Sequence, residues 1–90
     1  MKIVDNLSDN LRYYRKKYNL SQEKFAEVLG TSLSHLNKLE NKKVDIKAST
    51  IEKYASKLNK YDNNLSIDGE DLLTYHKNRI TSYNRIDEKK

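Results

Sequence analysis

The apolar residues of this 90-residue chain recur three and four positions apart in short segments, and this spacing most restricts its fold. Leu7, Leu11, Tyr14 and Tyr18 follow one another at intervals of 4, 3 and 4 residues, which places them along one side of an α-helix. No segment keeps the strict alternation of apolar and polar residues that marks a strand. The sequence therefore predicts an all-α fold.

The first predicted helix runs from about Ser8 to Tyr18, and Ser8 or Asp9 can cap its free amides. A fourth segment shows the same periodicity, with Asp45 and Ser49 as alternative N-caps. Its apolar positions are Ala48, Ile51, Tyr54, Ala55 and Leu58. Each of these helices is expected to contribute one apolar side to a shared core.

The fifth predicted helix extends from about Glu70 to Ile80, with Asp68 as its N-cap. The turn-rich segment before it is expected to lay Leu65 or Ile67 on the core. The apolar side of this fifth helix consists of Leu72, Leu73, His76 and Ile80. This side either closes the core of the monomer or forms a dimer interface, and the sequence leaves both alternatives open.

Two short helices in the middle of the chain meet at the connection Gly30-Thr31-Ser32. Ser21 and Ser32 can cap the second and third helices, and Gly30 supplies the positive φ that a sharp corner needs. Ala26 is small enough to let two helices approach closely at a steep angle. The third helix is expected to bury Leu36 and Leu39 and to keep outside Ser34, His35, Asn37, Lys38 and Lys42.

The positive charge of the chain is concentrated in its first two thirds. Residues 1–61 hold 13 basic and 7 acidic side chains, a net charge of +6, whereas residues 62–90 hold 5 and 6, a net charge of −1. A basic part beside a neutral one suggests a surface for a polyanion and a second part with a different task.

Composition excludes several classes of protein and site. Without cysteine the chain forms no disulfide, no thiolate metal site and no thiol nucleophile. No apolar run exceeds two residues, far below the roughly 20 that span a bilayer, so we expect a cytoplasmic location and no membrane partner. His35 and His76 lie in no ligand or catalytic pattern. We therefore expect no metal, no cofactor, no small-molecule ligand and no enzymatic activity.

The sequence resembles the phage repressor and Cro family (XRE family) of helix-turn-helix DNA-binding domains. The run LSQEKFAEVLGTS, residues 20–32, is similar to the second helix and turn of that family, and LNKLEN, residues 36–41, is similar to the end of its recognition helix. The apolar positions of the fourth helix fit as well, so the likeness covers about residues 8–58. It implies a compact bundle of five short helices of the lambda-repressor-like type with a central helix-turn-helix.

The resemblance also implies roles for individual residues. The positions that match major-groove base contacts in the family are Leu33, Ser34, Asn37 and Lys38. The positions that match its phosphate contacts are Gln22, Asn41, Lys42 and Lys43. Arg15 and Glu40 match a structural ion pair that joins the first helix to the end of the third.

Two positions depart from the family pattern. Lys42 stands where the family usually has the glycine that ends the third helix in a left-handed conformation, unless Asn41 takes that conformation instead. Leu33 replaces a polar base reader, and it cannot form a hydrogen bond with a base edge. It either contacts thymine methyl groups or belongs to a protein interface.

The sequence thus predicts a sequence-specific double-stranded DNA-binding regulator of transcription, a repressor that inserts residues 32–41 into the major groove. A homodimer is expected, because Leu, Ile, Val and Phe make up only 21 of the 90 residues and one short helix buries little DNA surface. Residues 1–61 would bind DNA. Residues 62–90 would form a loop, a fifth helix and a frayed tail that serve as a candidate dimerisation element. The alternative function is a protein-interaction module on the same fold, such as an antitoxin or accessory factor.

Overall fold

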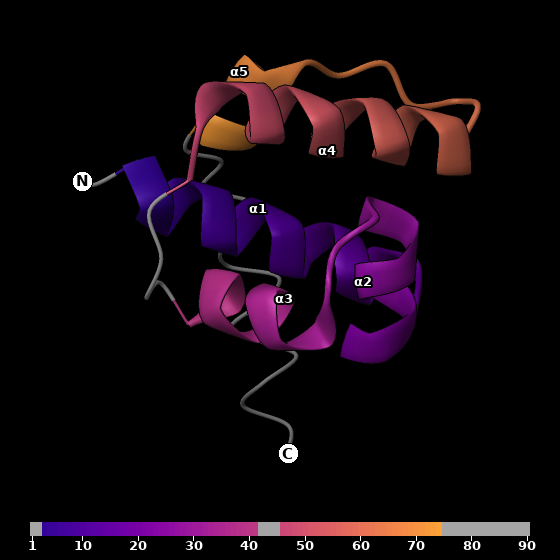
Figure 1. Cartoon of the computed structure of the whole chain (residues 1–90). Helices are drawn as coiled ribbons and strands as arrows, with labels where there is room; N and C mark the ends of the chain where they lie inside the picture. The colour runs from indigo at the N-terminus through magenta and orange to yellow at the C-terminus, as the bar shows by residue number, and fades with distance from the viewer. Residues whose placement is uncertain (1–2, 42–45, 75–90) are drawn as a thin grey trace.

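The computed structural model of the chain describes residues 3–41 and 46–74, and five α-helices lie within these ranges. They are α1 (Ile3–Lys17), α2 (Gln22–Leu29), α3 (Leu33–Glu40), α4 (Ala48–Tyr61) and α5 (Gly69–Leu73). α1 crosses the middle of the molecule, packing on α3 and on α5, and α2 packs on α3 and on α4 (Figure 1). The described residues contain no strand, and the predicted all-α bundle of five short helices is confirmed.

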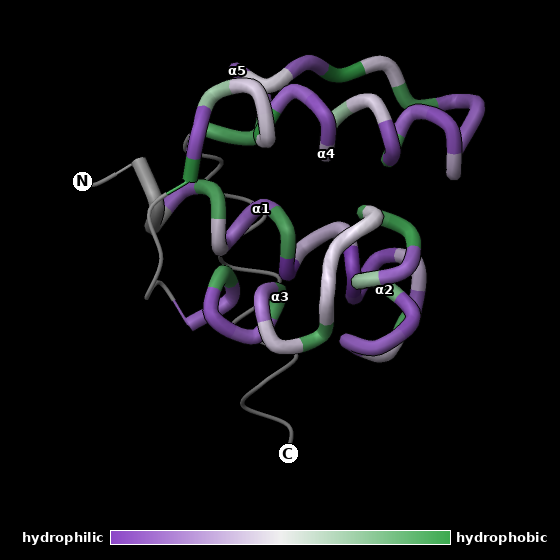
Figure 2. Tube along the Cα trace, in the orientation of Figure 1, coloured by the Kyte–Doolittle hydropathy of each residue, from purple (hydrophilic) through white to green (hydrophobic). Residues whose placement is uncertain are grey.

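A single buried cluster receives side chains from all five helices. Figure 2 shows hydrophobic and hydrophilic sections alternating along the helical turns, as expected for helices that each bury one side. The buried members of this core are Leu7, Leu11, Tyr14, Phe25, Ala26, Leu29, Leu36, Leu39, Ile51, Tyr54, Ala55, Leu58 and Leu72. Because the core includes Leu72, the described part of the predicted C-terminal portion packs on the helices of the predicted DNA-binding part.

The first helix begins earlier than its sequence pattern predicts, at Ile3 rather than near Ser8. Neither Ser8 nor Asp9 is therefore an N-cap. Ser8 is fully buried, and its hydroxyl donates a hydrogen bond to the carbonyl of Leu39 at the end of α3. This contact joins residues 31 positions apart, so the local sequence could not reveal it.

The fifth helix begins at Gly69 and ends at Leu73, so it stops short of the predicted end near Ile80, and residues 75–80 of the predicted helix lie outside the described residues. Asp68 caps its start, as predicted, and accepts a hydrogen bond from the amide of Asp71 at 3.0 Å. At its end, the buried side-chain amide of Asn10 donates to the carbonyls of Leu72 at 2.8 Å and Thr74 at 2.9 Å. These long-range bonds satisfy carbonyl groups that a longer helix would have used itself.

One helix cap and one loop settle alternatives that the sequence left open. α4 begins after Lys47, which makes no side-chain capping bond, so Ser49 is not its N-cap, and Asp45 lies outside the described residues. In the loop before α5, both Leu65 and Ile67 pack partly buried against the core. The side chain of Asn59 holds this loop to α4 by two hydrogen bonds with the backbone of Ile67, at 2.8 and 3.0 Å.

The ends of α1 and α4 meet in an aromatic contact. The rings of Tyr18 and Tyr61 lie edge to face with their centroids 5.1 Å apart, and the hydroxyl of Tyr18 donates to Asp62 Oδ2 at 2.8 Å. Burial, together with this hydrogen bond, raises the pKa of Tyr18 above its ordinary value, and the same bond lowers the pKa of the Asp62 carboxyl. The contact fixes the chain just after α1, from which α2 departs.

Candidate nucleic-acid interface

The turn between α2 and α3 has the geometry that the sequence predicts. Ser21 and Ser32 are the N-caps, and their hydroxyls accept hydrogen bonds from the amides of Lys24 at 3.1 Å and His35 at 3.0 Å. Gly30 ends α2 with φ 74° and ψ 35°, the left-handed conformation that favours glycine. These caps hold α3 at a fixed position relative to α2.

Substitution of Gly30 by alanine is expected to lower the free energy of unfolding by about 1 kcal/mol, because a side chain disfavours positive φ. A Cβ here would lie 3.6 Å from the Cε atoms of Lys53 and Lys57, which is ordinary van der Waals contact, so no clash adds to this cost. Urea denaturation measures the change. Gly30→Asn should cost less, since asparagine tolerates this conformation. An alanine variant destabilised by about 3 kcal/mol would contradict the assignment of the cost to φ alone.

One side of α3 is buried and the other is open to solvent. Leu36 and Leu39 are fully buried against the core, and Ala26 of α2 is 3% exposed beside them in the same cluster. The four positions that the resemblance assigns to base contact are all exposed. Together with Gln22 they line an open depression with a volume of about 380 Å³, formed by Gln22, Leu33, Ser34, Asn37 and Lys38. The fold thus brings the predicted base readers to one place on the surface.

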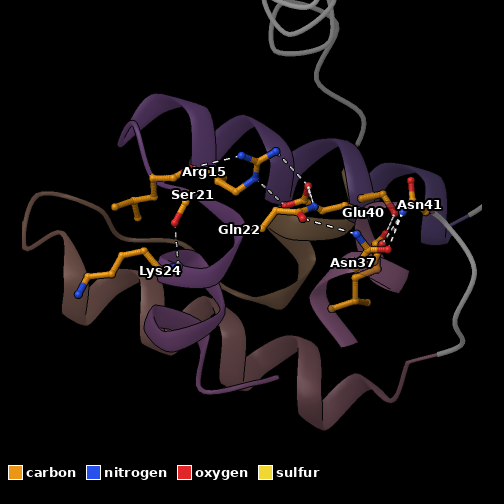
Figure 3. Close-up of polar contacts among 10 residues, drawn as sticks. Arg15, Ser21, Gln22, Lys24, Asn37, Glu40 and Asn41 are labelled. Atoms are coloured by element: carbon orange, nitrogen blue, oxygen red, sulfur yellow. Dashed lines mark hydrogen bonds and ion pairs between the residues drawn. The ribbon is translucent and has the colours of Figure 1, made fainter. Parts of the chain in front are cut away.

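An ion pair anchors the end of α3 to α1. Arg15 Nε and one of its terminal nitrogens donate to the two carboxylate oxygens of Glu40 at 2.8 and 3.1 Å (Figure 3). The Glu40 side chain is 3% exposed and that of Arg15 is 16% exposed, so the pair is largely removed from water. This bidentate geometry is the strongest form of a carboxylate–guanidinium contact.

A chain of side-chain amides leads from this ion pair to the exposed side of α3. Gln22 Nε2 donates to Glu40 Oε1 at 3.1 Å, Asn37 Nδ2 donates to Gln22 Oε1 at 3.5 Å, and Asn41 Nδ2 donates to Asn37 Oδ1 at 3.0 Å (Figure 3). A carboxylate only accepts hydrogen bonds, so Glu40 requires Gln22 to present its nitrogen and to turn its oxygen outward. The direction of each following amide is thereby set by the buried charge.

The helix-turn-helix family HTH_3 matches residues 11–62, a span that contains α2, the turn, α3 and α4. The chain belongs to this family. It is also similar to the control protein C.SmaI of Serratia marcescens, with 37% identity over 59 residues that cover 66% of this chain and 70% of the relative. No solved structure matches the chain significantly.

Membership of this helix-turn-helix family confirms the resemblance to the XRE type and makes the chain a DNA-binding regulator of transcription rather than an enzyme. Within the described residues, no helix is long and apolar enough to cross a membrane. No group of three or more His, Asp or Glu side chains in residues 3–41 and 46–74 is placed to hold a metal ion.

The residues predicted to contact phosphate are only partly described. Gln22 is half-buried at the first turn of α2, with its amide engaged by Glu40 and Asn37. Asn41 is exposed, and its φ of −97° and ψ of 8° show that it does not take over the left-handed conformation that the missing glycine would have supplied. It instead bonds back to Asn37 through its side chain. Lys42 and Lys43 lie outside the described residues.

Only two of the four predicted dimer positions lie in the described residues. Leu72 is fully buried within the single chain, so it belongs to the core of the monomer rather than to a dimer interface, and Leu73 packs half-buried against that core. α5 supplies these residues to the space between α1 and α4, which explains their burial. His76 and Ile80 lie outside the described residues.

Two contacts at the candidate interface were not predicted from the sequence. Asn37 and Asn41 are four residues apart on the helix, a spacing that brings side-chain amides together and could have indicated their contact. Lys53 Nζ donates to the carbonyl of Gly30 at 3.4 Å, which places a basic side chain of α4 at the turn. That contact depends on how α4 packs on α2, and no local signal predicts it.

Proposed function

We propose that this helix-turn-helix protein is a repressor that binds double-stranded DNA as a two-fold dimer, with α3 in the major groove. The observation that carries this proposal is the exposed side of α3, where Leu33, Ser34, Asn37 and Lys38 gather around one open depression. An α-helix fits the major groove, and this is the groove in which each base pair presents a distinct pattern of donors and acceptors.

Each polar side chain of this surface has a chemistry suited to bases or phosphates. Lys38 can donate to the guanine acceptors N7 and O6, and Asn37 can pair with adenine through its amide. Ser34 can donate or accept. Gln22 and Asn41 flank these residues, where the family places phosphate contacts, and the start of α2 presents free amides of its first turn.

The dimer follows from the size of this surface. One eight-residue helix contacts few base pairs, so useful specificity requires two copies on half-sites about 34 to 36 Å apart. We propose that residues 1–61 bind the half-site and that residues 62–90 take part in dimerisation. Occupancy of a promoter by such a dimer is sufficient to exclude other proteins from it, which is the simplest form of repression.

Selection of bound duplexes from a random pool tests the proposal, followed by affinity measurements at several salt concentrations. We expect a consensus with two-fold symmetry and an affinity whose logarithm falls steeply with the logarithm of the salt concentration, by about 0.9 per neutralised phosphate. Lys38→Ala combined with Lys43→Ala should weaken binding and flatten this slope, whereas Lys60→Ala, an exposed lysine in the last turn of α4, should not.

A flat salt response in the wild type would contradict the proposal, as would an asymmetric consensus bound by a single chain. Sedimentation of the protein with the selected duplex gives the stoichiometry, for which we expect two chains per duplex. A promoter that carries the selected site should be transcribed less when the protein is present, and increased transcription would contradict the repressor role.

A further inference from the structure

Leu33 is the apolar side chain among the five residues that line the depression. It is 45% exposed, and among the described residues it and Tyr61, at 48%, are the exposed large hydrophobic side chains. The ring of Tyr61 already has an aromatic partner, because it lies edge to face with that of Tyr18. Leu33 is the first residue of α3, directly after the N-cap Ser32, and it lines the depression shared by the predicted base readers.

Two neighbours of Leu33, Gln22 and Asn37, are held by hydrogen bonds to each other and to Glu40 and Asn41, and Leu33 stays exposed beside them. The amide of Gln22 is turned toward Glu40, and its oxygen accepts from Asn37. The oxygen of Asn37 in turn accepts from Asn41. The depression therefore has an apolar contact point at Leu33 and amide groups with fixed directions beside it.

In the major groove, the apolar group that a pyrimidine can present is a methyl group at ring position C5. Thymine carries it, whereas unmodified cytosine does not. Leucine offers no hydrogen bond, and burying a methyl against it removes apolar surface of both partners from water. A protein partner would fit this site less well, because a single leucine that shares the depression with Ser34, Asn37 and Lys38 presents little continuous apolar surface.

We infer that Leu33 reads the C5 methyl group of one pyrimidine in each half-site, so that binding depends on that methyl whether thymine or 5-methylcytosine supplies it. The inference rests on the proposed insertion of α3 into the major groove. It makes Leu33 a specificity-determining residue, and it makes the affinity of the protein sensitive to cytosine-5 methylation at that position.

The test uses the full chain and its selected duplex. Each thymine is replaced singly by deoxyuridine, which lacks only the methyl group, and affinity is measured by fluorescence anisotropy. For the wild type we expect a loss of about fourfold at one thymine of each half-site, and of roughly 15-fold when both half-sites are changed together, from about 0.8 kcal/mol per buried methyl. In a second arm, cytosine at that position should bind about fourfold more weakly than 5-methylcytosine, which identifies the methyl rather than the base as the recognised group.

Leu33→Ala supplies the decisive comparison. This variant should bind the thymine and deoxyuridine duplexes equally, and thermal melting should show an unchanged fold because the side chain is exposed. Tyr61→Ala, the matched removal of the other exposed hydrophobic side chain, should keep the wild-type preference for thymine.

The remaining outcomes overturn the inference. If Leu33→Ala keeps the full preference for thymine, another residue or the shape of the DNA reads the methyl. If the wild type binds its selected duplex but discriminates at no thymine, Leu33 reads nothing and the proposed function still stands. If no duplex is selected at all, the proposed function fails and the inference falls with it. If Leu33→Ala leaves DNA recognition unchanged but loses a protein partner, the residue is a protein contact.

Discussion

Replacement of Arg15 by alanine is expected to lower the free energy of unfolding by about 3 kcal/mol and the melting temperature by more than about 10 °C. The Glu40 side chain is 3% exposed, so the variant would leave a carboxylate in the interior without its cation. The hydrogen bond from Gln22 would remain, but a neutral donor compensates a buried charge only in part.

Lys24→Ala is the matched control for the loss of a basic side chain. Lys24 pairs with Glu27 at 3.7 Å, but both side chains are about two-thirds exposed, at 64% and 66%. Exposed pairs of this kind contribute under about 1 kcal/mol. Calorimetry of Arg15→Ala and Lys24→Ala at neutral pH measures the loss of stability in each variant. Equal, small losses in both would show that the Arg15–Glu40 pair is not a structural anchor of α3.

Asn37→Asp is expected to weaken binding to the selected duplex by about 100-fold, since each well-placed side-chain contact with a base contributes about 1–3 kcal/mol and a dimer makes it twice. The change replaces the Nδ2 donor by a second acceptor, which then faces Gln22 Oε1. It also sets a negative charge on the side of α3 that we propose to face DNA. The fold should be unaffected, because Asn37 is exposed.

The control for this experiment is Asn63→Asp, the same chemical change in the loop that follows α4. That residue is exposed, and the loop lies on the opposite side of the molecule from α3 (Figure 1). Its substitution should leave affinity nearly unchanged. Equal losses in the two variants would indicate a general effect of net charge, and tight binding by Asn37→Asp would exclude α3 as the reading surface.

The parts of the fold that could be predicted from the sequence are those with local causes. Serine N-caps at residues 21 and 32, the left-handed glycine at 30 and the helical spacing of Leu36 and Leu39 each act over a few residues, and each is confirmed. One boundary that was wrong lies where distant segments meet. α5 ends at Leu73, where Asn10 of α1 donates to the carbonyl of Leu72, 62 residues away.

The candidate site also has features with local causes and features that depend on distant partners. Its exposed positions on α3 could be predicted, because helical periodicity decides which side is buried. The directions of the Gln22 and Asn37 amides could not, since they follow from the carboxylate of Glu40, which reaches them only after α1, α2 and α3 have packed. The burial of Leu72 likewise depends on the packing of α5 between α1 and α4.

Two side chains of α1 that are two residues apart form hydrogen bonds with two different helices, α3 and α5. Ser8 donates to the carbonyl of Leu39 in the last turn of α3, and Asn10 donates to the carbonyl of Leu72 in the last turn of α5. α1 therefore sets both the distance and the angle between α3, the helix that we propose to face DNA, and the end of α5. In the proposed dimer, the relative placement of the two copies of α3 would then depend on α1. Substitutions at Ser8 or Asn10 would then alter the preferred half-site spacing without touching DNA.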